Sequence, residues 1–174
     1  MTDPANISLE TQVPDHAQGL FTALQDPRIY RFLDEDAPAT IDAVRQRIIR
    51  LSKGGPPDGS ERWLNWTVFR NDRIVGTTQA TVTPGNRASI AYVMSPDVWG
   101  TGVAATAVTR MTQALVRQFA TTHFIADTET GNLASQRLLV RLGLRDRLGP
   151  QDRWDQLGLR ARWDQPDRPA RPNS

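Results

Sequence analysis

The segment over residues 91–107 constrains this chain most, because it runs from a strand-like stretch through a glycine turn into a helix-like stretch. Gly100 and Gly102 carry no Cβ atom, so the backbone at the turn can approach a ligand closely. The amides that open a helix point outward at the positive end of the helix dipole. The junction is therefore predicted to bind an anion, and a pyrophosphate would fit there.

The composition fits one compact domain without cysteine chemistry. The chain has 174 residues, 39% of them hydrophobic and 23% charged, enough to bury roughly two-thirds of its unfolded surface. We predict one domain over residues 1–165 and a disordered tail over residues 166–174, which has nothing to bury. The absence of cysteine excludes thiolate metal sites and cysteine nucleophiles. Two histidines, His16 and His123, are too few for a multi-histidine centre, so we predict no metal.

The charge pattern argues against a polyanionic partner. The formal net charge is only +2, and the arginines are scattered instead of forming a basic stripe interleaved with aromatic residues. The first residues carry an acid where a signal peptide has a basic region, and no apolar run approaches the roughly 20 residues of a membrane span. We therefore expect a cytoplasmic protein that binds neither nucleic acid nor membranes.

Hydrophobic periodicity predicts an α/β layer structure around a mixed sheet. Strands are predicted over residues 7–13, 63–70, 74–83, 88–95 and 122–128, with one or two closing strands between residues 154 and 163. The three strands from residue 63 to residue 95 form an antiparallel meander. A helical crossover makes the strand at residues 122–128 parallel to the strand before the glycine turn.

Four helices are predicted: one opened by Pro14-Asp15, one that follows Thr40, one after the glycine turn and one that follows Asn132. Thr40 and Asn132 are candidate N-caps, since threonine and asparagine oxygens accept hydrogen bonds from first-turn amides. In the last helix, the predicted inward residues are Ala134, Leu138 and Leu142. Residues 28–36 are predicted to form a short irregular helix and loop.

Two motifs carry a family resemblance. One is Trp99-Gly100-Thr101-Gly102-Val103-Ala104, and the other is the segment that begins Asn132-Leu-Ala-Ser135 and ends Leu-Gly143-Leu144. With the order of elements, they resemble the GNAT acetyltransferase superfamily, and within it the ribosomal-protein N-terminal acetyltransferases. The first motif is similar to the acyl-CoA motif Gln/Arg-x-x-Gly-x-Gly/Ala, with Trp99 in place of the polar residue. The second is similar to an Asn-x-x-Ser helix that ends in Leu-Gly-Phe, with Leu144 in place of Phe.

The resemblance implies a sheet in which the strands ending near residues 95 and 128 splay apart. A pantetheine arm would then pair with the unpaired backbone as an extra strand, and the turn amides would hold the diphosphate of acetyl-CoA. The residues implied in binding acetyl-CoA are Tyr92, Val93, Met94, Trp99, Gly100, Thr101, Gly102, Val103, Ala104, Asn132 and Arg137. The edges of such sheets often pair, so a homodimer is also expected.

The reaction implied by the resemblance is direct attack of a neutral amine on the acetyl thioester. The backbone amide near Met94 would stabilise the oxyanion, and Ser135 would orient or protonate the leaving sulfur. Relatives often carry a glutamate base where Ser89 stands, which favours a weakly basic α-amine as the acceptor. Asp127 or Glu129 would serve as a base through a water molecule.

The acceptor amine is expected to enter between residues 30–36 and the closing strands. Acidic side chains there would attract a cationic amine. The candidate acceptor-binding residues are Tyr30, Asp34, Glu35, Trp66 and Ser89. Each has a plainer interpretation, since Asp34 and Glu35 also fit a solvated loop and Trp66 also fits the core.

Several alternatives stay open at this point. Asn132 fits a helix cap without a ligand, and Ser135 fits a residue that satisfies a first-turn amide. Without the usual glutamate and tyrosine, the chain also fits a non-catalytic acyl-CoA-binding module. The sequence from Gly100 to Ala105 also matches the dinucleotide fingerprint of an NAD(P)-dependent oxidoreductase, but the antiparallel strands before it do not suit a Rossmann unit.

Overall fold

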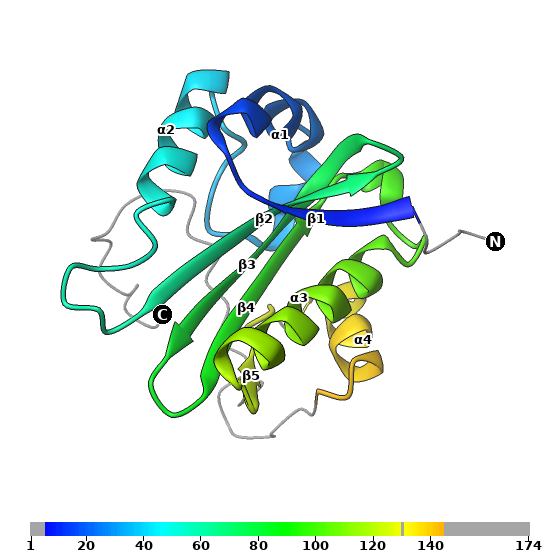
Figure 1. Ribbon diagram of the computed structural model, residues 1–174. Coiled ribbons are helices and arrows are strands. Elements are labelled where there is room, and N and C mark those ends of the chain that lie inside the picture. The colour runs from blue at the N-terminus through cyan, green and yellow to red at the C-terminus, as the bar shows by residue number, and fades with distance from the viewer. Residues whose placement is uncertain (1–5, 130, 145–174) are drawn as a thin grey trace, which may run out of the picture.

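The computed structural model describes residues 6–129 and 131–144 and is built on one five-stranded sheet (Figure 1). The strands are β1 (Ile7–Thr11), β2 (Arg62–Arg70), β3 (Arg73–Thr83), β4 (Arg87–Met94) and β5 (His123–Ile125). They lie in the order β1-β2-β3-β4-β5. The first three pairs are antiparallel, and β4 and β5 are parallel. The predicted mixed, mostly antiparallel sheet is therefore confirmed.

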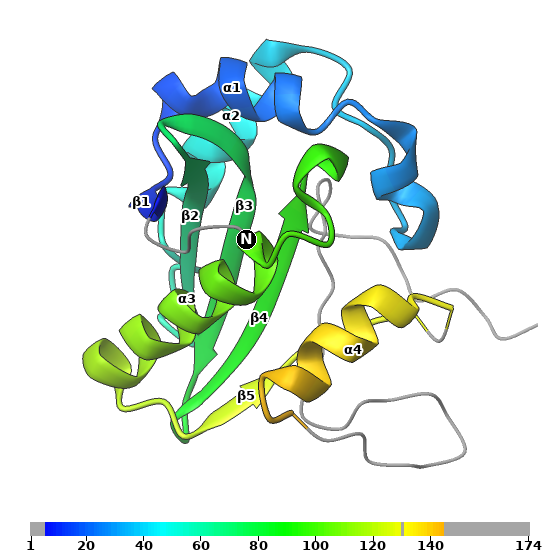
Figure 2. The same ribbon diagram turned by 90° about the vertical axis from the view of Figure 1, so that its right-hand side faces the viewer.

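Helices cover both faces of the sheet, as predicted. The α-helices are α1 (Ala17–Ala23), α2 (Ile41–Leu51), α3 (Val103–Phe119) and α4 (Leu133–Arg141), and the 3-10 helices are η2 (Pro14–His16), η3 (Pro27–Phe32) and η4 (Pro96–Val98). Figure 2 shows α1 and α2 on one face of the sheet and α3 on the other, with α4 beside β5.

Each layer has its own hydrophobic core. Under α1 and α2, the cluster contains Leu20, Leu24 and Ile48. Under α3 and α4, the cluster contains Ile90, Met111, Leu115 and Leu139. A third cluster joins Met94 at the end of β4 to Val103 at the start of α3. Burial of Val98 and Val103 in the third cluster therefore fixes both flanks of the glycine turn to the sheet.

The two predicted caps are confirmed. The Thr40 hydroxyl accepts a hydrogen bond from the Ala43 amide at 3.0 Å, at the start of α2. The Asn132 side-chain oxygen accepts one from the Ser135 amide at 3.2 Å, at the start of α4. Each cap satisfies an amide that lacks an intrahelical partner, which explains why the sequence located these two helix starts.

Two details of the sequence prediction are wrong. The strand predicted over residues 122–128 is only three residues long, because β5 pairs with β4 at residues 123–125 and β4 then runs away from it. Ala134, predicted to face inward, is exposed, whereas Leu139 is buried. The inward face of α4 is formed by residues 135, 138, 139 and 142. Compared with the prediction, Ser135 takes the place of Ala134 on this face.

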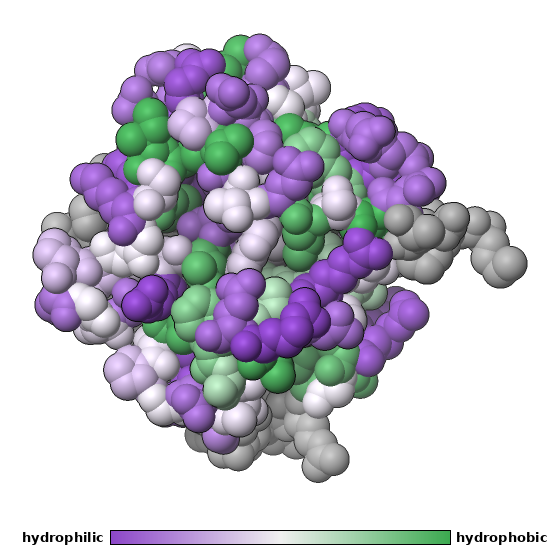
Figure 3. Space-filling model, in the orientation of Figure 1, coloured by the Kyte–Doolittle hydropathy of each residue, from purple (hydrophilic) through white to green (hydrophobic). Residues whose placement is uncertain are grey.

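The predicted closing strands at residues 154–163 and the predicted tail at residues 166–174 lie outside the described residues. None of the described helices combines the length and the apolar character that a membrane span requires. On the face shown in Figure 3, hydrophilic side chains lie over α1, α2 and α3, with smaller hydrophobic patches between them.

Neighbouring residues of α3 provide a test of the core. Leu115 is fully buried and Val116 is 50% exposed. Leu115→Ala is expected to lower the free energy of unfolding by about 2–5 kcal/mol, because it removes buried methyl groups and leaves a cavity. Val116→Ala is expected to change it by less than about 0.5 kcal/mol. Urea denaturation measures both, and equal losses would contradict the placement of α3.

Candidate functional site

The glycine turn has the open geometry that an anion site needs. Gly100 and Gly102 have φ angles of 70° and 85°, in the left-handed region that favours glycine. A Cβ atom built on either glycine would meet nothing within 4 Å. Gly102 is the N-cap of α3, and it provides no side-chain cap to the helix. The 17-residue helix α3 therefore begins without a side-chain cap, next to two glycines that face open space.

The turn that leads to these glycines is held by polar contacts. Ser95 and Arg73 both hydrogen-bond the Asp97 carboxylate. The Ser95 hydrogen bond is the main cause of a lowered pKa of Asp97, and Arg73 adds to it. The Trp99 indole N–H donates to the carbonyl of Met94 at 2.9 Å. Trp99, which replaces the polar residue of the acyl-CoA motif, thus ties the turn to the end of β4.

Beyond its first residues, β4 has no strand beside it on the β5 side within the described part of the chain. The parallel pairs are Arg87 with His123, Ala88 with Phe124 and Ser89 with Ile125, whereas β4 continues to Met94. Figure 2 shows the two strands diverging from that point. We call the unpaired edge of residues 90–94 of β4, together with the start of α4, the seam.

The ladder on the other side of β4 sets the direction of its backbone groups. The Ser95 amide donates to the Val75 carbonyl of β3 at 2.8 Å. Because successive residues of a strand point their backbone groups to opposite sides, the amide and carbonyl of Met94 are directed away from β3. The Met94 carbonyl already accepts the hydrogen bond from the Trp99 indole N–H. The Met94 amide therefore faces the seam, as the predicted oxyanion donor must.

Ser135 and Tyr92 belong to the two elements that define the seam, α4 and β4. Ser135 lies in the first turn of α4, on its inward face. The Tyr92 hydroxyl is buried and has no hydrogen-bond partner among the described residues. Burial raises the pKa of Tyr92, while the neighbouring Ser135 hydroxyl acts to lower it. Each of the two elements therefore places one hydroxyl-bearing side chain at the seam.

The other predicted residues of α4 and its leading loop have mixed positions. The Asn132 amide donates to the Glu129 carbonyl at 2.8 Å, which closes the turn before α4. The side chains of Glu129 and Arg137 are exposed. Glu129 therefore shapes this turn through its backbone, and its role as a base stays a prediction, as does the contact of Arg137 with the donor.

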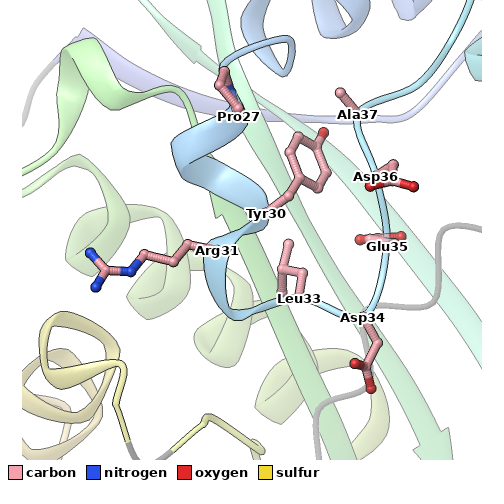
Figure 4. A pocket seen from close by; sticks show the side chains of 8 residues that line it. All are labelled: Pro27, Tyr30, Arg31, Leu33, Asp34, Glu35, Asp36 and Ala37. Atoms are coloured by element: carbon pink, nitrogen blue, oxygen red, sulfur yellow. The ribbon is translucent and has the colours of Figure 1, made fainter.

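A hollow of about 680 Å³ lies beside the irregular segment that follows α1. It is lined by Pro27, Tyr30, Arg31, Leu33, Asp34, Glu35, Asp36 and Ala37 (Figure 4). We call it the acidic hollow, since it has three carboxylates and one arginine, and Arg31 points away from the three acids in Figure 4. Its position agrees with the predicted acceptor-binding segment.

Tyr30 anchors this hollow. Its hydroxyl donates to the Leu24 carbonyl at 2.7 Å. Burial is the main cause of a raised pKa of Tyr30, the Glu35 carboxylate raises it further, and Arg47 lowers it. Glu35 and Arg47 thus lie near the phenol, while Asp34 and Asp36 are exposed. Tyr30 and Glu35 form the inner wall, and Asp34 and Asp36 face the solvent.

The structure does not bring Trp66 and Ser89 to this hollow. Trp66 packs in the core under α3, on the face of the sheet opposite Tyr30, which packs under α1 and α2. Ser89 pairs with Ile125 where the seam begins. Ser89 therefore borders the seam, and Trp66 has the position of a core residue.

The sequence predicted a short helix and loop over residues 28–36, and η3 confirms the helix, but its contacts with the two ends of the seam were missed. The Arg28 guanidinium lies 5.8 Å from the Trp99 ring centroid. A Cβ atom on Gly131 would come within 3.1 Å of the Phe32 ring. Helix η3 therefore contacts both the glycine turn and the loop before α4. The pair Asp26-Pro27 could have indicated where this helix starts, since proline favours the first position of a helix. In the structure, the Asp26 carboxylate accepts a hydrogen bond from the Arg28 amide at 2.9 Å.

A family model described as an acetyltransferase (GNAT) domain matches residues 6–145. The chain belongs to this family. The match spans the sheet, the glycine turn and α4, so the GNAT fold and the resemblance found in the two motifs are confirmed. None of the curated proteins matches the sequence.

Solved structures share the GNAT fold at low sequence identity. The ribosomal-protein-S5-alanine acetyltransferase from Vibrio fischeri is 16% identical, with a TM-score of 0.70 over 82% of this chain and 81% of its own. The ribosomal L7/L12 alpha-N-protein acetyltransferase in complex with coenzyme A is 16% identical, with a TM-score of 0.68 over 79% of this chain and 78% of its own. A GNAT acetyltransferase from Bacillus anthracis is 14% identical, with a TM-score of 0.67 over 88% of this chain and 92% of its own. These likenesses show the fold.

Two glycines with the same backbone conformation test the turn. Gly102 has a φ of 85° at the start of α3, and Gly85 has a φ of 84° in the β3–β4 hairpin. Replacing either by alanine is expected to cost about 1–2 kcal/mol of stability, because an L-residue is strained there. Only Gly102→Ala is expected to weaken acetyl-CoA binding, by about tenfold or more. Calorimetric titration measures this, and equal affinities of the two variants would contradict an anion site at the turn.

Proposed function

We propose that this chain is an acetyl-CoA-dependent N-acetyltransferase that moves the acetyl group directly to an amine. The observation that carries the proposal is the continuity between the open amides of the glycine turn and the unpaired edge of β4. A diphosphate needs the first and an extended pantetheine arm needs the second. Along one strand–turn–helix unit, the unpaired edge of β4 is followed by the glycine turn, just as the pantetheine arm is followed by the diphosphate in coenzyme A.

The residues present fit the donor at each point. The amides of residues 100–104 are the donors for the diphosphate, helped by the helix dipole, with each contact worth on the order of 0.3–2 kcal/mol. The backbone groups of Tyr92, which face away from β3, would pair with the pantetheine amides, and the Met94 amide is left for the thioester oxygen. Asn132 and Arg137, at the start of α4, would contact the donor from the side opposite β4.

Transfer of the acetyl group then needs only positioning and hydrogen bonding. The amine nitrogen attacks the thioester carbon, and the Met94 amide stabilises the negative charge that develops on the carbonyl oxygen. As the carbon–sulfur bond breaks, Ser135 donates a hydrogen bond to the sulfur that receives the electron pair. The proton released by the nitrogen neutralises the thiolate through solvent. No covalent enzyme intermediate is required.

The absence of a carboxylate at position 89 favours an α-amino acceptor. An α-amine has a pKa of about 8, so its neutral form costs about 1.4 kcal/mol at pH 7, whereas a lysine side chain at about 10.4 costs about 4.6 kcal/mol. Ser89 supplies no base at the point where the seam opens. Asp127 or Glu129 would act through water. A protein N-terminus or a small amine therefore suits this site better than a lysine side chain.

The acidic hollow is the proposed acceptor site. It adjoins η3, which touches both ends of the seam. The carboxylates of Asp34, Glu35 and Asp36 would raise the local concentration of a cationic amine. The amine would lose its proton on the way from this hollow to the thioester.

Ligand binding and turnover test the proposed function together. Acetyl-CoA and coenzyme A at about 100 times their dissociation constants are expected to stabilise the protein by about 2.7 kcal/mol, while NADH is not. Mass spectrometry of peptide and amine panels is then expected to show one acetyl group on α-amines. Stabilisation by NADH alone would contradict the proposal. Stabilisation by acetyl-CoA without turnover would support the second candidate, a non-catalytic acyl-CoA-binding module, which Ser89 in place of glutamate favours.

The acidic hollow can be tested by charge removal. The double variant Asp34→Asn/Asp36→Asn is expected to raise KM for a cationic acceptor several-fold and to leave KM for acetyl-CoA unchanged, since attraction of the amine is lost. Asp72→Asn, in the exposed hairpin turn, is the control for loss of an acidic charge and is expected to behave as the parent. Steady-state kinetics at low salt measures both. An unchanged acceptor KM in the double variant would show that the acceptor binds elsewhere.

A further inference from the structure

The strand–turn–helix unit that contains the glycine turn carries no net cation for the anion it is proposed to bind. Residues 88–109 contain no lysine, arginine or histidine. Asp97, the acid of this stretch, pairs with Arg73, so these two charges cancel. The dipole at the start of α3 supplies only about half a positive charge, which is less than a diphosphate carries in the opposite sign. A cation from another segment would therefore strengthen this site.

Arg28, in the first turn of η3, brings such a cation to the turn. Its guanidinium carbon lies 5.8 Å from the centroid of the Trp99 ring, within the distance at which a cation and an aromatic face attract each other. Trp99 directly precedes Gly100, and its indole N–H is held by the Met94 carbonyl at 2.9 Å. The ring therefore keeps the guanidinium close to the residue that begins the glycine turn. Arg28 also supplies a polar group where Trp99 has replaced the one in the acyl-CoA motif.

The contacts of Arg28 leave one edge of its guanidinium open. Nε donates to the two carboxylate oxygens of Asp26 at 3.0 and 3.1 Å, and Nη2 donates to one of them at 2.7 Å. These hydrogen bonds use the edge formed by Nε and Nη2. A guanidinium has five N–H groups, and among the described residues Nη1 donates to none. The side chain is 67% exposed, so the edge formed by Nη1 and Nη2 can reach a ligand.

We propose that Arg28 binds the diphosphate of the acyl donor through the edge formed by Nη1 and Nη2. Two N–H groups on one edge match two oxygens of a phosphate and can donate two parallel hydrogen bonds. Asp26 holds the other edge, and the Trp99 ring supports the plane, so the fork is oriented before the ligand arrives. The inference rests on the proposed function, to which it adds a side chain that binds the donor. Helix η3 then belongs to the donor site as well as to the acidic hollow.

Titration calorimetry with coenzyme A tests this contact without turnover. Arg28→Gln is expected to weaken binding by about tenfold, because a charged contact with two hydrogen bonds is lost. Arg28→Lys is expected to weaken it by about threefold, since lysine keeps the charge and loses the fork. Arg45→Gln is the matched control. Arg45 is also an exposed arginine beside an aspartate, Asp42 at 3.4 Å, but it lies in α2, and its loss is expected to leave the affinity unchanged.

Two further titrations separate a contact with the diphosphate from other effects of the charge. Dephospho-coenzyme A lacks the 3′-phosphate and keeps the diphosphate, so Arg28→Gln is expected to weaken its binding by the same factor. A loss seen only with coenzyme A would place Arg28 at the 3′-phosphate and overturn the assignment. Raising the salt from about 0.05 M to about 0.5 M is expected to reduce the difference between parent and variant, because ions screen exposed charges. A difference that does not depend on salt would contradict an ionic contact.

Two outcomes of the first titration overturn the inference while the proposed function stands. One is an Arg28→Gln variant with the parent affinity, and the other is an Arg45→Gln variant that loses as much. A parent protein that binds no coenzyme A would instead overturn the proposed function, and this contact with it. Both arginines are exposed, so the variants are expected to fold as the parent does, which urea denaturation checks.

Discussion

The short ladder between β4 and β5 is the constraint on which the rest of the site depends. Three residue pairs hold the parallel strands together, and beyond them the outer backbone groups of β4 have no strand to bond. Unpaired amides and carbonyls at a sheet edge favour an extended partner. In this chain the edge leads directly into the open amides that begin α3. An extended molecule that ends in a diphosphate satisfies both.

The proposed function assigns different groups to the two faces of the sheet. Ser135, in the first turn of α4, is the proposed partner of the leaving sulfur. On the face covered by α1 and α2, Tyr30 and the acids of the irregular segment line the hollow that is proposed for the amine. Helix η3 contacts the glycine turn through Arg28 and the loop before α4 through Phe32. In this proposal, donor and acceptor would approach the reaction from opposite faces.

Much of this arrangement could be predicted because it depends on local chemistry. The turn glycines, the Thr40 and Asn132 caps and the alternation along β2, β3 and β4 each leave a pattern within a few residues of sequence. The limits of β5 and the face of α4 could not be predicted in this way, since they depend on the direction in which β4 leaves its partner. The contacts of Arg28 with Trp99 and of Phe32 with Gly131 join segments about 70 and 100 residues apart, and no local pattern indicates them. The alternation along β2 is compatible with Trp66 as a residue that lines the acceptor site or as a core residue. Only its packing under α3 shows that it is a core residue.

Hydrogen–deuterium exchange with and without coenzyme A tests most directly whether the seam and the turn form one donor site. The amides of residues 92 and 94 face the seam, and those of residues 102–104 open α3, so both groups should exchange quickly in the free protein. Coenzyme A is expected to slow exchange in both segments together and to leave the β2–β3 ladder unchanged. Slowing at the turn alone, or at neither segment, would contradict a donor bound along the edge of β4.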